Sequence, residues 1–124
     1  MTTRILIVDD SPLFRKLLRK ALEVQAGWQI CGEAANGKEG IELAQKTSPD
    51  LIVLDLSMPV MNGLEAARIL GQQMPNIPVI MFTSFFTPSL ESEMLAAGVT
   101  KVISKTGPLS DLIESIRCLV EEAA

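Results

Sequence analysis

The chain has 124 residues and a formal net charge of -4, and 48% of its residues are hydrophobic. This length and composition fit one globular domain with a core of its own, and they argue against a disordered chain. The acidic balance argues against nucleic-acid binding by this domain, and no apolar stretch is long enough to span a membrane. We therefore expect a single cytoplasmic domain over residues 1–124.

Residue types that commonly bind zinc or carry redox chemistry are scarce. The chain has no histidine, which removes the commonest general base and the zinc sites that contain histidine. Cys31 and Cys118 do not form a closely spaced pair, so we expect reduced structural thiols.

Apolar runs alternate with segments of helical periodicity along the chain. The runs at 5–8, 51–54 and 79–82 are apolar on both faces, as in strands of a parallel sheet that is covered on both sides. Shorter or edge strands are expected at 29–34 and 101–104. An order of strand and helix repeated five times predicts an α/β fold with a doubly wound parallel sheet.

Capping and turn residues precede each predicted helix. Ser11 and Pro12 provide an N-cap and a proline at the first helical position. The helix that follows is predicted to bury one apolar face, made of Leu13, Leu17, Leu18, Ala21 and Leu22. The later helices are predicted to begin near Asn36-Gly37, Asn62-Gly63, Pro88 and Pro108.

Three carboxylates are expected to meet at one edge of this sheet. Ligands of open α/β sheets bind beyond the carboxyl ends of the strands, where the strand order reverses. For the order 2-1-3-4-5 that crevice lies between the first strand, which Asp9 and Asp10 follow, and the third, which Asp55 follows. Each aspartate alone could be a helix cap or a solvated loop residue. Three together indicate a cation site, and oxygen ligands without histidine or cysteine favour Mg²⁺, with Mn²⁺ or Ca²⁺ as alternatives.

Two further residues follow the other strands that reach this edge. Thr83 ends the fourth predicted strand, and Lys105 follows the fifth. A metal ion, an ammonium and a hydroxyl around a carboxylate can bind a phosphoryl group that is transferred to that carboxylate. Either residue alone is more often an ordinary surface or strand-end residue, so the combination carries the prediction.

At this point several segments resemble a known family. The chain is similar to the receiver domain of bacterial two-component response regulators over nearly its whole length, in "ILIVDDSPLFRKLL", "GEAANGKEGIELA", "PDLIVLDLSMPVMNGLEAAR", "IPVIMFTS" and "LAAGVTKVISK". The phrases "CGEAANG" and "DLSMPVMNGLEAAR" most resemble receivers of NarL-like transcription factors. The resemblance implies a flavodoxin-like (βα)5 fold with a five-stranded sheet in the order 2-1-3-4-5.

The resemblance also implies a role for each residue of the predicted site. Asp55 would accept a phosphoryl group from the phosphohistidine of a sensor histidine kinase or a phosphotransfer protein. Mg²⁺ would be held by Asp9, Asp10, Asp55 and the backbone carbonyl of Ser57. Lys105 would contact Asp55 and then a phosphoryl oxygen, and Thr83 would move toward the phosphoryl group. Such a domain is a signalling phosphoacceptor and not an enzyme that turns over a substrate.

The resemblance implies an output surface as well. The fourth helix, fifth strand and fifth helix would form the face that binds an output domain, a downstream protein or a second copy of the chain. Two positions depart from the usual pattern there. Thr106 replaces a proline that commonly follows the lysine, so a trans bond is expected. Val102 replaces an aromatic residue that turns inward in the family, and Phe85 or Phe86 could take part in its place.

Three other functions remain open on the sequence. A small phosphatase of the haloacid dehalogenase type would need an acid two residues after its nucleophilic aspartate, where Ser57 stands. A flavodoxin-like electron carrier would need a hydroxyl- and glycine-rich phosphate loop in place of Asp9 and Asp10. A receiver that binds a partner without phosphorylation would not need the residues around Asp55, all of which are present.

Overall fold

The computed structural model describes residues 2–84 and 87–123, and its sheet has the strand order β2-β1-β3-β4-β5. The strands are β1 (Thr3–Val8), β2 (Trp28–Ala34), β3 (Leu51–Leu54), β4 (Val79–Thr83) and β5 (Lys101–Ser104). The helices are α1 (Pro12–Glu23), α2 (Gly37–Thr47), α3 (Gly63–Gln73), α4 (Pro88–Ala96) and α5 (Leu109–Ala123). All strand pairs are parallel, with β2 and β5 at the edges. The predicted flavodoxin-like fold and strand order are confirmed.

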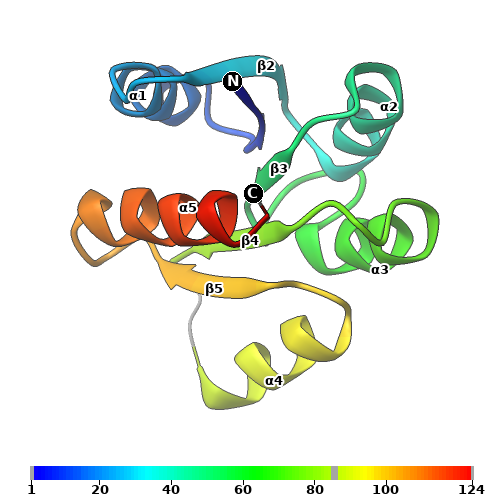
Figure 1. Cartoon of the computed structure of the whole chain (residues 1–124). Helices are drawn as coiled ribbons and strands as arrows, with labels where there is room; N and C mark the ends of the chain where they lie inside the picture. The colour runs from blue at the N-terminus through cyan, green and yellow to red at the C-terminus, as the bar shows by residue number, and fades with distance from the viewer. Residues whose placement is uncertain (1, 85–86, 124) are drawn as a thin grey trace.

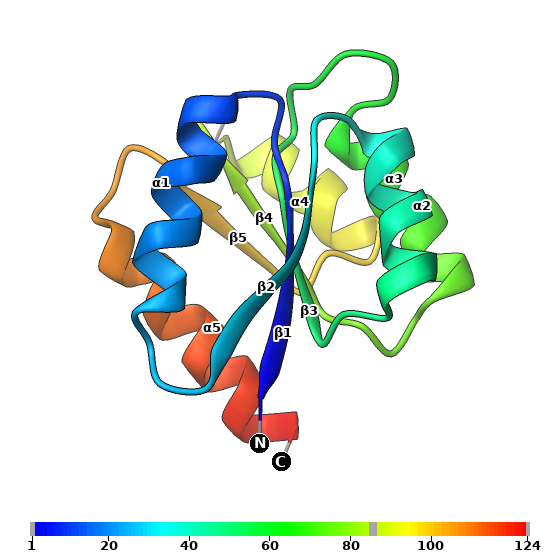
Figure 2. The ribbon, with the colours of Figure 1, turned by 90° about the horizontal axis from the view of Figure 1, so that it is seen from above.

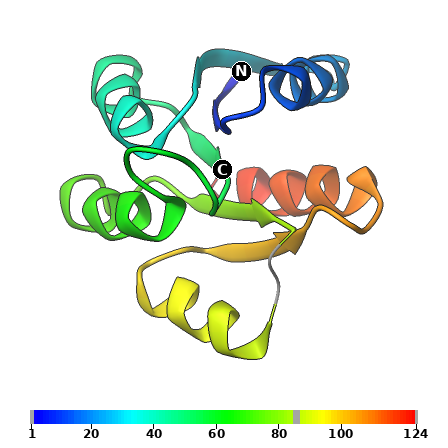
Figure 3. The same cartoon turned by 180° about the vertical axis from the view of Figure 1, so that it is seen from behind.

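Helices cover both faces of the sheet. Helices α1 and α5 lie on one face, and α2, α3 and α4 lie on the other, as Figures 1 and 2 show from two directions and Figure 3 shows from behind. Successive strand side chains point to opposite faces. Leu6 and Leu54 therefore belong to the core under α2, α3 and α4, whereas Ile5 and Val53 belong to the core under α1 and α5.

Capping side chains determine where the first four helices begin. Ser11 Oγ accepts a hydrogen bond from the backbone N–H of Phe14 at 3.2 Å. Asn36, Asn62 and Thr87 cap α2, α3 and α4 in the same way. Because each cap satisfies a backbone N–H that the helix leaves unpaired, the helices start at defined positions beside the carboxyl edge of the sheet.

The predicted buried face of α1 is partly wrong. Leu18 and Leu22 are buried, but Leu13 and Leu17 are 78% and 55% exposed. The inward stripe is instead formed by Phe14, Leu18 and Leu22, which are spaced four residues apart and pack in the core under α1 and α5. Apolar residues cover about half of the circumference of this helix, which is wider than the stripe that the sheet covers. An exposed apolar stripe remains on the outer side of α1.

Three smaller expectations can be compared with the fold. Cys31 and Cys118 are free and half-buried, as expected. No peptide bond in the described residues is cis, so the bond between Lys105 and Thr106 is trans. Within the same residues, no helix has the length and apolar character needed to cross a bilayer.

Candidate functional site

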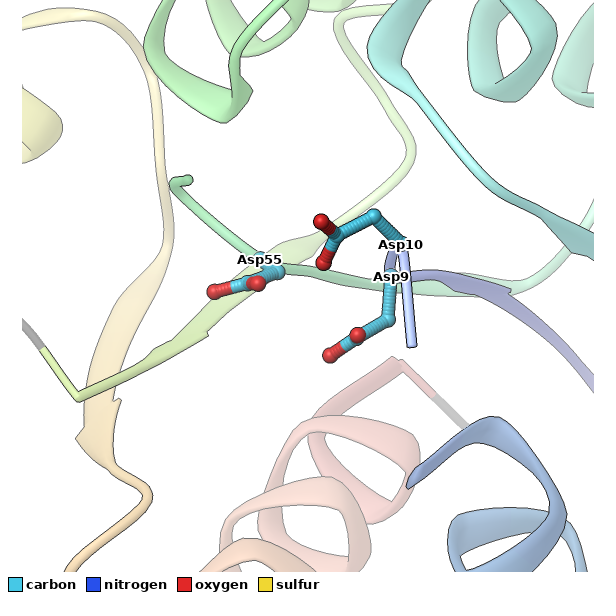
Figure 4. A group of neighbouring side chains, drawn as sticks. All are labelled: Asp9, Asp10 and Asp55. Carbon is cyan, nitrogen blue, oxygen red and sulfur yellow. The ribbon is translucent and has the colours of Figure 1, made fainter. Parts of the chain in front are cut away.

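The carboxyl ends of β1 and β3 bring three carboxylates together (Figure 4). Asp9 and Asp10 follow β1, and Asp55 follows β3, which is paired directly with β1. One carboxylate oxygen of each residue lies within 4.8 Å of an oxygen of the other two. Asp9 and Asp55 are only 2% and 7% exposed, whereas Asp10 is exposed. The three side chains converge as the strand order predicts.

Backbone groups orient the two buried carboxylates. Asp9 Oδ1 accepts a hydrogen bond from the N–H of Ser11 at 2.9 Å, and Asp55 Oδ1 accepts one from the N–H of Leu56 at 2.8 Å. The second oxygen of each carboxylate, Oδ2, takes no part in these local bonds. Such local bonds satisfy buried acceptors that would otherwise lose their hydration.

Lys105 supplies the cation. Its Nζ lies 2.7 Å from Asp9 Oδ2 and 3.3 Å from Asp55 Oδ2, and its side chain is 15% exposed. The backbone N–H of Lys105 donates to the carbonyl of Thr83 at 2.9 Å, which places Lys105 beside the end of β4. Thr83 is completely buried at that position. The edge thus gathers residues from β1, β3, β4 and the segment after β5.

The charges of this cluster do not balance. Three carboxylates share one ammonium, so the site keeps an excess of negative charge in a partly buried place. Its donors are all oxygens, which suits a hard divalent cation such as Mg²⁺. Asp9, Asp10 and Asp55 therefore fit such an ion. Ser57 is exposed and stands two residues after Asp55, and the role of its carbonyl as a ligand stays a prediction.

Burial raises the pKa of Asp55 above the ordinary value of an aspartate. The neighbouring charge of Asp9 raises this pKa further, whereas the ammonium of Lys105 and the hydrogen bonds from Lys105 and Leu56 oppose the increase. The ionised carboxylate of Asp55 therefore lowers the stability of the metal-free fold. A bound divalent cation would offset that cost.

This pKa shift predicts how stability depends on pH. A raised pKa in the folded state means that the ionised Asp55 destabilises the metal-free protein above that pKa, and that the penalty disappears as pH falls toward the unfolded value. Asp55→Asn is therefore expected to raise the free energy of unfolding at neutral pH in the absence of metal. The gain should shrink on acidification, measured by urea denaturation with a metal chelator. A gain that grows in acid would contradict the shift.

The loop after Asp55 contains a strained residue. Val60 has a φ of +67°, and the N–H of Met61 donates to the carbonyl of Pro59 at 2.7 Å, so the chain turns tightly around Val60. A β-branched residue rarely adopts this left-handed region, because its Cβ crowds the backbone. Strain of this kind is frequent in loops at functional sites.

Val60→Gly is expected to raise the free energy of unfolding by about 0.5–1 kcal/mol, because glycine adopts positive φ without a steric penalty. The side chain of Val60 is 78% exposed, so little packing is lost. Val24→Gly is the matched control, since Val24 is 76% exposed but has a φ of -73°. That variant should lose about 0.5–1 kcal/mol in the same urea titration. Equal effects of the two substitutions would exclude strain at Val60.

Two residues of α1 reach the site without having been predicted from the sequence. The ring of Phe14 lies under the ammonium of Lys105, with the Nζ 4.3 Å from the ring centroid. Arg15 donates from its guanidinium to the carbonyl of Asp9 at 2.6 Å and forms an ion pair with Glu33 on β2 at 3.3 Å. The spacing of Phe14, Leu18 and Leu22 was the signal that could have revealed the inward face.

The family's inward-turning aromatic residue is replaced by Val102, with Phe85 or Phe86 as alternatives. Val102 is half-buried in β5 and packs against the core under α2, α3 and α4. Phe85 and Phe86, the alternative aromatic residues, lie outside the described residues. How the end of β4 is coupled to the outer face stays a prediction.

Comparison with known proteins decides the family. The model of the response regulator receiver domain matches residues 5–117. The chain belongs to the response regulator receiver family. The response regulator protein VraR of Staphylococcus aureus is 38% identical to it over 117 residues, which are 94% of this chain and 56% of VraR. This receiver domain thus spans about half the length of the curated relatives that it matches.

Solved structures agree with the family at the level of the backbone. A LuxR-family two-component response regulator from Aurantimonas superposes with a TM-score of 0.94 at 29% identity, covering 98% of this chain and 87% of that one. The CheX–CheY–BeF3–Mg complex from Borrelia burgdorferi superposes with a TM-score of 0.88 at 25% identity, covering 95% and 89%. The receiver fold and the two-component family follow from these matches.

Proposed function

We propose that this receiver domain accepts a phosphoryl group on Asp55 in a reaction that depends on Mg²⁺. The proposal depends on one observation: a receiver-family chain places Lys105 3.3 Å from the Asp55 carboxylate inside a cluster of three acidic side chains. The donor would be the phosphohistidine of a sensor histidine kinase or of a phosphotransfer protein. The similar CheX–CheY complex from Borrelia burgdorferi, which contains BeF3 and Mg, supports the same chemistry.

The transfer forms one bond and breaks one bond. An oxygen of the Asp55 carboxylate attacks phosphorus, the bond from phosphorus to the donor nitrogen breaks, and the imidazole of the donor takes up a proton. Lys105 would contact a phosphoryl oxygen and offset its charge. The hydroxyl of Thr83 would donate a hydrogen bond to the phosphoryl group. Because the pKa of Asp55 is raised by burial, its carboxylate is also a better nucleophile when ionised.

The acidic cluster would hold the metal. Asp10, Asp9 and Asp55 are the residues that can supply oxygen ligands, and the carbonyl of Ser57 is a proposed fourth. When bound, the ion would cancel the repulsion between the carboxylates and the negatively charged phosphoryl group. Asp10 is the exposed member of the cluster, so its carboxylate can bind the ion without competing with Lys105.

The partners of the domain follow from this role. The exposed stripe on α1 consists of Leu13 and Leu17 beside Lys16 and Lys20, and it begins three residues after the acidic pair. This stripe supports a protein donor that docks next to the site. An output domain, a downstream protein or a second copy of the chain is proposed as the partner of the face formed by α4, β5 and α5. A cytoplasmic location is part of the same proposal.

Labelling with acetyl phosphate tests the reaction and its metal requirement. The wild-type chain is expected to gain the mass of one phosphoryl group with Mg²⁺ and none with a metal chelator. Asp10→Ala should lose most of the labelling, because it removes a metal ligand and leaves the ion pairs of Lys105 intact. The readout is the mass of the intact protein, measured by mass spectrometry after incubation in a neutral buffer without fluoride. Equal labelling of wild type with and without Mg²⁺ would contradict the proposal.

The labelling experiment and an assay of phosphate-monoester hydrolysis distinguish two of the other functions. A receiver that acts only by binding a partner would remain unlabelled under all conditions. A phosphatase would release phosphate from a phosphate monoester in many turnovers, and Ser57 stands where that chemistry needs an acid.

A further inference from the structure

The ammonium of Lys105 has an aromatic neighbour as well as two carboxylates. Phe14 is the third residue of α1, and Lys105 Nζ lies over its ring, 4.3 Å from the centroid. The same nitrogen is 2.7 Å from Asp9 Oδ2 and 3.3 Å from Asp55 Oδ2. The cation is therefore surrounded by three groups from three different segments of the chain.

The ring of Phe14 is held in place by the fold. Its backbone N–H is bound by the Ser11 hydroxyl at 3.2 Å, which fixes the first turn of α1. Its ring packs on the ring of Phe82 in β4, with centroids 5.8 Å apart and planes tilted by 32°. Phe82 is only 3% exposed, so this support is part of the core. Phe14 thus presents its face at a position that the sheet determines.

The aromatic face of Phe14 suits a position beside the largely buried ammonium of Lys105. The lysine ammonium is a strongly hydrated charge on a flexible stem, and its side chain here is only 15% exposed. The negative face of an aromatic ring attracts such a cation, and the attraction increases when water is excluded. An aliphatic side chain of similar volume would fill the space but would leave that side of the ammonium without an electrostatic partner.

We propose that Phe14 is a positioning residue, whose ring face keeps the Lys105 ammonium beside Asp9 and Asp55 so that it is in place when a phosphoryl group arrives. The contribution to transfer depends on the proposed function, whereas the contact itself does not. A role in core packing alone would need only an apolar residue at this position.

Two variants separate the two roles. Phe14→Leu keeps an apolar side chain and removes the aromatic face, and Phe14→Tyr keeps both. In the metal-free wild type, the ring current should shift the NMR signals of the Lys105 Cε protons upfield. Phe14→Tyr should retain this shift, and Phe14→Leu should lose it. Labelling by acetyl phosphate should slow by roughly 3- to 30-fold in Phe14→Leu and by less than about 2-fold in Phe14→Tyr.

A lysine variant provides the control. In a Lys105→Met background, Phe14→Leu should slow labelling no further, because the cation that the ring attracts is gone. An equal slowing in both backgrounds would show a purely structural effect and overturn the proposal. Unshifted Cε protons in the wild type would overturn it as well, even if Phe14→Leu did not fold. If the wild type takes no label, the proposed function fails, and the ring-current shift alone still decides whether Phe14 positions Lys105.

Discussion

Replacing Asp55 with asparagine is expected to abolish labelling by acetyl phosphate in the presence of Mg²⁺. An amide oxygen is a far weaker nucleophile than a carboxylate, and it carries no charge to balance a cation. The other groups of the site are not expected to compensate. Asp9 follows the neighbouring strand β1, and its carboxylate is already paired with the Lys105 ammonium at 2.7 Å. The measurement is the mass of the intact protein after incubation with the phosphodonor.

A carboxylate at the other end of β3 provides the control for this experiment. Asp50 precedes β3 at the opposite end from Asp55, is exposed, and accepts a hydrogen bond from the N–H of Arg4. Asp50→Asn removes the same charge at a distance from the acidic cluster, and it should leave labelling unchanged. Full labelling of Asp55→Asn, or an equal loss of labelling in both variants, would refute Asp55 as the phosphoacceptor.

Gly63→Ala is expected to lower the free energy of unfolding by about 3 kcal/mol or more. A Cβ on Gly63 would stand 2.1 Å from the carbonyl oxygen of Asp55 and 2.9 Å from Leu56 Cα. Both are backbone atoms, so relief requires a shift of the loop and not the rotation of a side chain. The N–H of Gly63 also donates to the carbonyl of Leu56 at 2.8 Å, and the shift would strain this bond.

A glycine in the same helix separates this clash from a general effect of glycine replacement. At Gly71 an added Cβ would come no closer than 3.3 Å to a backbone atom, the carbonyl oxygen of Ala97. Gly71→Ala should therefore stay within about 1 kcal/mol of the wild type, since alanine also favours the helix. Urea denaturation measures both variants. Because Asp55 would move with the loop, the labelling rate of Gly63→Ala should fall as well. A stability of Gly63→Ala equal to that of Gly71→Ala would refute the close approach.

Much of this fold was determined by local features of the sequence. Strands buried on both faces need continuous apolar runs, and these runs marked β1, β3 and β4 to within two residues. Capping residues before the helices marked most of their starts, because unpaired N–H groups at a helix start need an acceptor. The acidic residues of the site were predictable for a related reason. Charged groups directly after a buried strand are costly, which singled out Asp9, Asp10 and Asp55.

Tertiary packing decided the features that local rules leave open. Apolar residues cover about half of the circumference of helix α1, so its sequence did not determine which part of that face lies against the sheet. Packing turned Phe14 inward, leaving Leu13 and Leu17 exposed. That rotation put an aromatic face next to Lys105, a residue 91 positions away along the chain (105 − 14). The contact arises only when separate segments are packed together, because no spacing within the chain encodes the distance between two side chains that meet across a sheet.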